Sequence, residues 1–396
     1  MSDRPSIRLR SKIKPQRLRH GFPWVYFDQL VMDRRTKAHA PGTLAILEDS
    51  ERKPIGLCTI NPSSKIVARM LDRDPNARVG ESWFADRISR ALALRNRLFD
   101  APDYRLVHAE ADGLPGVIID RFGDTCVLQP NAAWAERSLE DLTAALITQT
   151  DIVNVLKNAG GRTRALEGLD DISKVLYGDA PEEPKAVSMN GATYMADLTG
   201  GQKTGLFYDQ RLNHAFAAGL ARNARVLDVF SHVGGFALAS LAAGAGSALA
   251  VDSSGPALDL ARQGATQMGA EARFDRRQGD AFDVLAQLGR EGALFDLVIC
   301  DPPAFAPAKP ALEAGLRAYE RVARLAAPLV AQGGILALCS CSHAADLAAF
   351  RGASIRGIGK AGRTGRLIHT GFAGPDHPMH SHLAESGYLK ALFFAL

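Results

Sequence analysis

The chain has 396 residues, more than one hydrophobic core usually serves, so we expect two or three domains. Hydrophobic residues make up 46% of the chain and charged residues 23%, a composition that excludes an intrinsically disordered protein. The net charge of +4 is too small to indicate a polyanionic partner by itself. The sequence opens without an apolar signal segment, and no run of about 18 apolar residues follows, so we expect a cytoplasmic protein that does not enter a membrane.

The cysteines are odd in number and scattered, which argues against a disulfide framework and for a reducing compartment. Two of them form a C-x-C pair at the end of an apolar run, in "ILALCSCSHA". No second pair of cysteine or histidine residues lies at zinc-site spacing, so we expect no metal. The five are Cys58, Cys126, Cys300, Cys339 and Cys341.

Basic residues alternate with apolar ones near the start of the chain, at Arg8, Arg10, Lys12 and Lys14. A period of two predicts a strand with one basic face. Aromatic residues follow in "HGFPWVYFDQL", and "GTLAILED" and "PIGLCTINP" are typical of strands. We therefore expect a β-rich domain over residues 1–72.

Two interpretations of this basic face stay open at this point. The side chains could form an electrostatic footprint for nucleic acid, with the aromatic residues available for stacking on bases. They could equally be a solvated edge strand, because lysine and arginine protect sheet edges from aggregation. Charge alone slightly favours the second interpretation.

Residues 73–190 are expected to form a small α+β domain. The segment "SWFADRISRALALRNRLF" has apolar residues at helical spacing, and "YRLVHAEADGLPGVIIDRFGDTCVLQ" indicates strands separated by turns. Cys126 is expected in the core, and Asp112 and Asp120 are assigned to turn chemistry. No catalytic constellation is visible in this part.

From residue 191 to 396, strands and helices alternate, which predicts a doubly wound α/β sheet. In such sheets ligands bind outside the carboxyl ends of the strands. The expected strands cover 225–230, 247–251, 272–277, 295–300 and 334–340, and the expected helices cover 235–243, 255–267, 280–288 and 311–330.

Acidic residues follow three successive strands of this predicted sheet. Asp228 closes the first strand, ahead of a turn with Gly234 and Gly235 that lets backbone approach a ligand closely. Asp252 ends the second strand, where a ribose diol is held in this architecture, and Asp280 could accept a hydrogen bond from an adenine amino group. A helix N-cap would explain either of these two acids singly. The missing G-x-G-x-x-G spacing weakens the case for a nicotinamide cofactor.

The fourth strand ends in "VICDPPAF". Two consecutive prolines cannot continue a helix or a central strand, so we expect a stiff loop at the sheet edge. This loop would present the Asp301 carboxylate and the Phe305 ring near a planar substrate.

These features resemble the class I S-adenosylmethionine-dependent methyltransferases. The segment "TGGQKTGLFYDQRLNH" is similar to the K-T-G-x-x-x-D-Q-R segment of bacterial large-subunit (23S) ribosomal RNA methyltransferases, particularly the cytosine-C5 family with an N-terminal PUA domain. The likeness runs through nearly the whole chain and includes "RHGFPWVY", "ADGLPGVIIDRFGD", "GPDHP" and "GYLKAL".

The resemblance implies a Rossmann-like methyltransferase domain, S-adenosylmethionine as cofactor, and a PUA-type RNA-binding domain that contacts ribosomal RNA. Whether the protein is a monomer or a homodimer stays open. The resemblance favours nucleic-acid binding over a solvated edge strand as the role of the basic face. Arg8, Arg10, Lys12 and Lys14, with Phe305, are therefore expected to contact the RNA. Around the cofactor and the substrate entrance the resemblance implies Lys203, Thr204, Gly205, Tyr208, Asp209, Gln210 and Arg211. From the strand ends and their loops we also assign to the cofactor Asp228, Phe230, Ser231, Gly234, Gly235, Asp252, Asp280, Asp301 and Pro302.

Methyl transfer to cytosine C5 needs a nucleophile, because C5 becomes reactive only after a thiolate has added to C6. The family's S-C-S motif matches residues 340–342, so this role carries over to Cys341. Cys339 lies two residues earlier, still within the apolar run, and is expected in the core. Asp301 near cytosine N3 would stabilise the charge that develops on the ring. His343 is either a base or the start of the next helix, and Cys300 is expected to be buried.

Two alternatives stay open. The acceptor could be guanine or an exocyclic nitrogen, where no thiol is needed, or the chain could be a non-catalytic RNA-binding assembly protein. The glycine- and arginine-rich segment 351–371 is expected to be either an RNA contact or a mobile surface loop.

Overall fold

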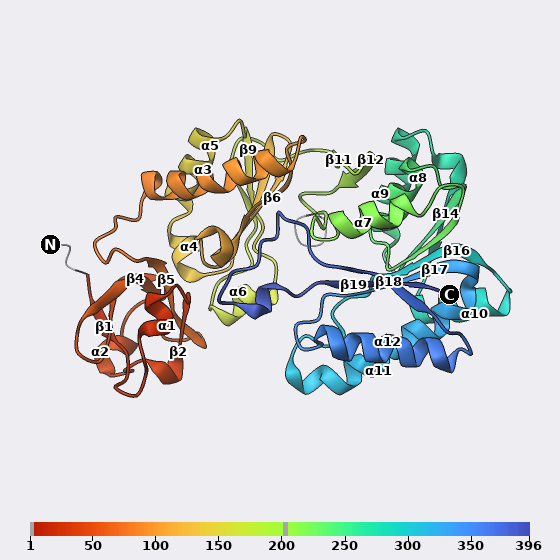
Figure 1. Ribbon diagram of the computed structural model, residues 1–396. Coiled ribbons are helices and arrows are strands. Elements are labelled where there is room, and N and C mark those ends of the chain that lie inside the picture. The colour runs from red at the N-terminus through yellow and green to blue at the C-terminus, as the bar shows by residue number, and fades with distance from the viewer. Residues whose placement is uncertain (1–3, 201–204) are drawn as a thin grey trace. The chain divides into compact units, whose positions relative to one another are not determined.

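The computed structural model describes residues 4–200 and 205–396, which form two compact units. Unit 1 contains residues 4–182, 198–200 and 376–384 of the described chain, and unit 2 contains 183–197, 205–375 and 385–396. Figure 1 shows the elements of each unit along the chain. Within the described residues, no helix is long and apolar enough to cross a membrane.

The first part of unit 1 is a five-stranded sheet with a core of aliphatic and aromatic side chains. The predicted strands at 42–49 and 54–62 are confirmed. The strands in sheet order are β1 (Ser6–Arg8), β3 (Thr43–Glu48), β4 (Pro54–Ile60), β5 (Ile66–Asp72) and β2 (Trp24–Tyr26), with the short helices α1 (Gln16–Arg19) and α2 (Arg34–Lys37) beside them.

The predicted basic strand is much shorter than its alternation suggested. It ends at Arg8, and Leu9 adds a single bridge to Leu30. The N–H of Ile13 then bonds to the carbonyl of Arg10, so the chain turns before α1. Lys12 and Lys14 therefore lie in an exposed turn, because this local hydrogen bond replaces continued strand pairing.

The second part of unit 1 is another five-stranded sheet, covered by helices. The expected helix at 82–99 is confirmed, and Cys126 is buried as expected. Trp134 stacks parallel to Phe84 in the core, with ring centroids 5.8 Å apart. The elements are α3 (Glu81–Leu98), α4 (Ala133–Arg137), α5 (Leu139–Gln149), α6 (Arg162–Leu166) and, in sheet order, β10 (Lys174–Tyr177), β9 (Asn154–Lys157), β8 (Thr125–Pro130), β7 (Val117–Phe122) and β6 (Asp103–His108).

Asp112 and Asp120 form ion pairs, so their assignment to turn chemistry is wrong for Asp120 and incomplete for Asp112. The Arg105 guanidinium donates to both carboxylate oxygens of the buried Asp120, at 2.8 and 3.0 Å. Arg95 is fully buried and donates to both oxygens of Asp112, at 2.7 and 2.8 Å. Asp112 also accepts the N–H of His108 within the turn.

We expect the substitution Arg95→Met to lower the free energy of unfolding of unit 1 by about 3–5 kcal/mol, because it leaves the Asp112 carboxylate without its cation. Arg90→Met on the same helix is the control; Arg90 is exposed and pairs with Asp86, so its loss should cost under about 0.5 kcal/mol. All three tryptophans lie in unit 1, so urea unfolding followed by tryptophan fluorescence reports on this unit. Equal effects of the two substitutions would contradict the prediction.

Unit 2 contains the doubly wound α/β sheet that the alternation predicted. Six of its strands run in the same direction, and β19 is antiparallel to both of its neighbours. The sheet order is β15 (Phe274–Gln278), β14 (Ser247–Asp252), β13 (Arg225–Val229), β16 (Phe295–Cys300), β17 (Val330–Ser340), β19 (Lys390–Ala395) and β18 (Arg366–Gly371).

Helices cover both faces of this sheet (Figure 1). On one face lie α7 (Arg211–Gly219), α8 (Gly235–Ala242), α9 (Gly255–Gln267) and the hairpin β11 (Lys185–Met189) and β12 (Ala192–Ala196); on the other lie α10 (Ala281–Arg290), α11 (Leu312–Ala326) and α12 (Leu347–Lys360). The domain boundary proposed after residue 190 falls in the turn of this hairpin.

The predicted strands and helices of this unit are confirmed to within a few residues, with two differences. Helix α11 ends at Ala326, before Pro328, which cannot donate the next helical hydrogen bond. Segment 351–371 is helix α12 followed by strand β18, so its interpretation as a loop is wrong. Gly357 explains the helix: a Cβ there would lie 2.4 Å from the carbonyl oxygen of Glu320, so glycine lets α12 pack closely on α11.

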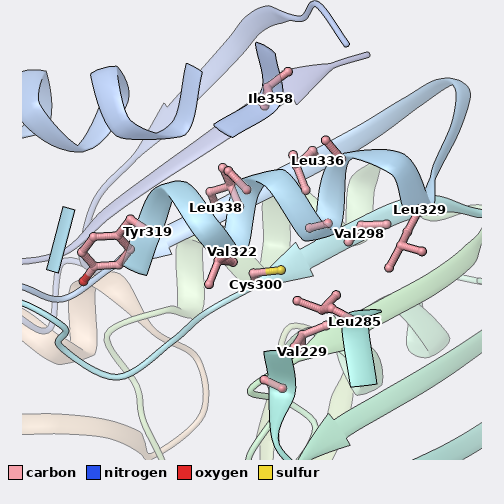
Figure 2. Close-up of a cluster of buried hydrophobic side chains, with 14 of the residues drawn as sticks. Val229, Leu285, Val298, Cys300, Tyr319, Val322, Leu329, Leu336, Leu338 and Ile358 are labelled. Atoms are coloured by element: carbon pink, nitrogen blue, oxygen red, sulfur yellow. The ribbon is translucent and has the colours of Figure 1, made fainter. Parts of the chain in front are cut away.

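The core of unit 2 fills the space between the sheet and helices α10, α11 and α12 (Figure 2). Val229, Val298 and Leu338 come from three neighbouring parallel strands, and Val322 faces them from α11. Cys300 lies in this core, as expected, and burial raises the pKa of its thiol. The carboxyl ends of the same strands carry the candidate site.

Candidate active site at the carboxyl edge of the sheet

The turn between β13 and α8 is tightly folded. Phe230, His232 and Gly234 have φ values of 64°, 50° and 81°, which are unusual for the first two residues. A Cβ on Gly235 would lie 2.8 Å from Nε2 of the buried His214, so only glycine fits there without displacing the ring. Gly234 is the N-cap of α8 and Gly235 is its first residue, so both predicted glycines lie where the turn joins the helix.

Asp228 lies buried beneath this turn. Its Oδ2 accepts the N–H groups of Phe236 and Ala237, at 3.2 and 2.9 Å, and so binds the N-terminus of α8. Its Oδ1 and the Oγ of Ser231 are buried without a hydrogen-bond partner among the described residues. Burial raises the pKa of Asp228 to about 7, although the two N–H groups act in the opposite direction.

The two other acids at strand ends accept hydrogen bonds from nearby backbone N–H groups. Asp252 accepts the N–H groups of His232 and Ser254, at 2.8 and 2.9 Å, so it fixes the glycine turn from the neighbouring strand. Asp280 is the N-cap of α10, as one sequence interpretation proposed. A carboxylate has about four lone-pair positions, so both retain the capacity to accept hydrogen bonds from a ligand.

The D-Q-R segment lies at the start of α7. Tyr208 is buried, and the Arg211 guanidinium lies 5.4 Å from the centre of its ring. Asp209 accepts the hydroxyl of Tyr388 at 2.7 Å, which joins this segment to the C-terminal strand region. The buried Gln210 accepts from Asn213, but its Nε2 has no partner in the described chain.

The remaining residues of this motif are placed only in part. Gly205 has a φ of 101°, which favours glycine. Lys203 and Thr204 lie outside the described residues.

The loop that carries Cys341 is held by a network of buried hydroxyl groups. Ser340 donates to the Tyr319 hydroxyl at 2.9 Å, and the Tyr319 and Ser342 hydroxyl oxygens are 2.6 Å apart. Ser342 also accepts the N–H of Ala306, from the Asp-Pro-Pro loop, at 2.9 Å. The two loops that the sequence placed near the substrate are therefore bonded to each other.

Cys341 is half-buried, whereas Cys339 is buried, so the structure separates the two thiols as expected. Burial raises the pKa of Cys339 well above its usual value. Asp301 follows β16, and its N–H donates to the carbonyl of Val229 on the adjacent strand. His343 is exposed and does not begin a helix, because α12 starts only after its N-cap, Asp346.

Phe305 is half-buried in an aromatic cluster. Its ring centroid lies 6.4 Å from that of Phe230, 6.1 Å from Phe282 and 5.0 Å from Tyr319. The Phe230 ring therefore lies at the same edge of the sheet as the Asp-Pro-Pro loop, in which Pro302 is buried. The sequence analysis missed Tyr319, which carries no local signal.

The basic residues expected at the RNA lie in unit 1, whereas Phe305 lies in unit 2. Arg10 donates from Nε to the carbonyl of Leu30 at 2.9 Å, so part of its guanidinium is used within the domain. Arg8 is half-buried, and Lys12 and Lys14 are exposed. Trp24 donates to Glu110 at 2.7 Å and is half-buried, which limits its use for stacking.

The chain matches two family models. Residues 102–351 match the S-adenosylmethionine-dependent methyltransferases, and residues 7–73 match a PUA-like domain. A solved structure described as a putative SAM-dependent methyltransferase from Streptococcus mutans shares the fold, with a TM-score of 0.83 at 18% identity over 99% of this chain and 100% of its own. A putative methyltransferase complexed with SAH gives the same TM-score and coverage. The fold is thus that of a class I methyltransferase with an N-terminal PUA-like domain.

Curated relatives are similar over almost their full length. The "Ribosomal RNA large subunit methyltransferase" of Deinococcus radiodurans is 33% identical over 100% of this chain and 98% of its own. The "Ribosomal RNA large subunit methyltransferase I" of Alteromonas mediterranea is 34% identical over 95% of both chains. The chain therefore belongs to the ribosomal RNA large subunit methyltransferase I family of S-adenosylmethionine-dependent enzymes.

The carboxyl edge has polar groups that fit this cofactor. Three buried side-chain atoms, Asp228 Oδ1, Ser231 Oγ and Gln210 Nε2, have no partner in the described chain and come from the glycine turn and the D-Q-R segment. Such atoms are costly unless a ligand satisfies them. The described residues contain no group of three or more metal-ligating side chains.

We expect Asp228→Asn to stabilise the cofactor-free protein at pH 8 by about 3 kcal/mol and to have little effect near pH 4. Because the folded-state pKa lies above the unfolded value, this group favours folding while protonated, and the contribution is lost as the pH rises through about 7. The amide would keep the oxygen that accepts from Phe236 and Ala237. Urea unfolding at both pH values tests this.

Asp283→Asn, on the exposed part of α10, controls for the loss of one negative charge. A less stable Asp228→Asn protein at pH 8 would contradict the prediction.

Proposed function

We propose that this protein methylates C5 of a cytosine in large-subunit ribosomal RNA, with Cys341 as the covalent nucleophile. The observation that carries the proposal is the position of Cys341: a half-buried thiol on a loop that is hydrogen-bonded to the Asp-Pro-Pro loop, at the edge of the sheet where we propose that the cofactor binds. The names of the curated relatives support the RNA class, and the S-C-S motif supports the position modified.

The chemistry requires the thiolate form of Cys341. Its sulfur adds to C6 of the cytosine, and the electron pair of the C5–C6 double bond makes C5 nucleophilic. The cofactor supplies the methyl group on a sulfonium centre. C5 takes the methyl group and becomes tetrahedral. A base then accepts the C5 proton, and the electron pair of that C–H bond re-forms the C5–C6 double bond as the bond between C6 and sulfur breaks, so the thiolate is regenerated.

Asp301 has the position to assist this step. It directly follows β16, and its N–H is fixed to Val229, so its backbone is held at the strand end. A carboxyl group near cytosine N3 would stabilise the negative charge that develops on the ring when sulfur adds. This role requires a protonated carboxyl or a proton shared with N3.

The PUA-like domain is proposed to bind RNA through its exposed basic turn. Lys12 and Lys14 are both exposed there, and the family model for this domain covers residues 7–73. Lysine contacts to phosphates supply affinity without base specificity.

We expect Cys341→Ala to abolish methylation while Cys339→Ala, its matched control, retains most activity. The two substitutions remove the same thiol two residues apart, but Cys339 is buried in the sheet core. The measurement is mass spectrometry of nucleosides from large-subunit ribosomal RNA, in cells that express each variant in place of the wild type.

Loss of one 5-methylcytidine with Cys341→Ala alone is the expected result. Full methylation by this variant would exclude the covalent route. A methylated guanosine that depends on the protein, with unchanged 5-methylcytidine, would move the acceptor to a nitrogen and leave the cofactor assignment intact.

We expect Lys12→Ala and Lys14→Ala each to weaken RNA binding and to reduce the slope of log K against log salt concentration by about 0.7–0.9. Filter binding of a ribosomal RNA fragment over a salt series gives both quantities. Lys174→Ala, at an exposed position on β10, is the control. An unchanged slope in the double variant would remove the basic turn from the RNA interface.

A further inference from the structure

We propose that Lys390 is a positioning residue whose ammonium group holds the Cys341 loop and keeps the Cys341 sulfur in its thiolate form. The inference rests on the proposed function in one respect: it explains how Cys341 becomes a nucleophile. It concerns a residue of β19, a strand that the mechanism above does not use.

Lys390 is bound to the loop on both sides of the thiol. Its Cα pairs with Ser340 in the antiparallel register of β17 and β19, so it lies across from the residue that precedes Cys341. Its Nζ then donates to the carbonyl oxygens of Ser342 and Ala345, both at 2.7 Å. The ammonium is thus fixed to the carbonyls that follow the thiol.

The charge of Lys390 is in no ion pair with a carboxylate of the described residues, although the negative charge of Asp346 acts on it. The residue is only 5% exposed, and the two contacts of its Nζ with described residues are to carbonyl oxygens. Buried cations are normally paired with an anion, because desolvation otherwise disfavours the charged form. Two carbonyl dipoles satisfy two of its three N–H groups and leave it open to an anion at the loop.

The Cys341 sulfur is suited to be this anion. Burial lowers the pKa of Lys390, whereas negative charge at Cys341, and then at Asp346, acts in the opposite direction. The attraction is mutual, so the ammonium favours the thiolate. Asp346 is exposed and already caps α12 through the N–H of Ala349, which makes it the weaker partner.

Other ionisable groups face the same loop. Tyr319 lies on α11. Burial is the largest cause that raises the pKa of its hydroxyl, and negative charge at Cys341 also raises this pKa, whereas the hydrogen bonds with Ser340 and Ser342 lower it. Asp301 on the Asp-Pro-Pro loop, His343 on the loop itself and Tyr388, whose ring centroid lies 5.6 Å from that of His343, also belong to these groups. Of these groups, Lys390 is the one that is both cationic at neutral pH and buried.

Lys390 takes part in no proton transfer. When the Cys341 thiolate adds to C6, its negative charge passes to the ring, and it returns when the C5 proton is lost and the carbon–sulfur bond breaks. The ammonium keeps all three protons throughout, so it favours the resting thiolate and its release as leaving group.

The test is the pH dependence of Cys341 alkylation by iodoacetamide in the full chain without cofactor or RNA, followed by mass spectrometry of the peptide. Lys390→Gln removes the charge but keeps an N–H donor for the carbonyls, and Lys390→Arg keeps the charge. In Lys390→Gln we expect the alkylation midpoint to rise by about one pH unit, so that the rate at pH 7 falls about tenfold. The rate at pH 10 should equal that of the wild type.

Lys390→Arg should retain a midpoint close to the wild-type value. Tyr319→Phe is the control for loop position, because it breaks the contacts with Ser340 and Ser342 without changing any charge. A Lys390→Gln protein with an unchanged midpoint would overturn the inference. So would an equal decrease of its rate at every pH, since that indicates altered access to the sulfur.

This experiment is independent of the proposed reaction. If Cys341→Ala retained methylation while Lys390→Gln raised the alkylation midpoint, the nucleophile assignment would fail and the charge effect would stand. If Cys341→Ala abolished methylation while Lys390→Gln left the alkylation midpoint unchanged, the nucleophile assignment would stand and the charge effect of Lys390 would fail.

Discussion

The candidate site depends on the register of three parallel strands. Val229, Cys300 and Leu338 are aligned across β13, β16 and β17, so the residues that follow them leave the sheet at one edge. This register brings the glycine turn, the Asp-Pro-Pro loop and the S-C-S loop together from positions far apart in the sequence. A displacement of one residue would turn each of these side chains to the opposite face, because side chains alternate along a strand.

The same edge contains charges and polar atoms that the protein does not neutralise by itself. Among the described residues, Asp228 is buried with one oxygen that has no hydrogen-bond partner, and Lys390 is buried with its Nζ bonded to two carbonyl oxygens. In unit 1, by contrast, the buried Arg95 is paired with Asp112. The contrast is expected where binding and catalysis are selected over stability, because a site for a polar ligand must leave hydrogen-bonding capacity open.

Local patterns predicted the sheet of unit 2 well because its parallel strands are short apolar runs bounded by turn residues. The same reasoning failed for residues 10–14, where period-two alternation continued into a turn, since Ile13 bonds back to Arg10. It also failed for segment 351–371. Glycine usually weakens a helix, but Gly357 is required where α12 packs on α11, and only that contact reveals it.

The sequence by itself determined the doubly wound sheet, the three acids at strand ends, the glycine turn and the deeper burial of Cys339 relative to Cys341, because periodicity and motif spacing are local properties. Only the tertiary structure decided the partners of these groups. Tyr319 reaches the S-C-S loop from α11 and Lys390 reaches it from β19, and neither position carries a signal in its own segment. Hydrogen bonds between distant segments depend on packing, which no local pattern encodes.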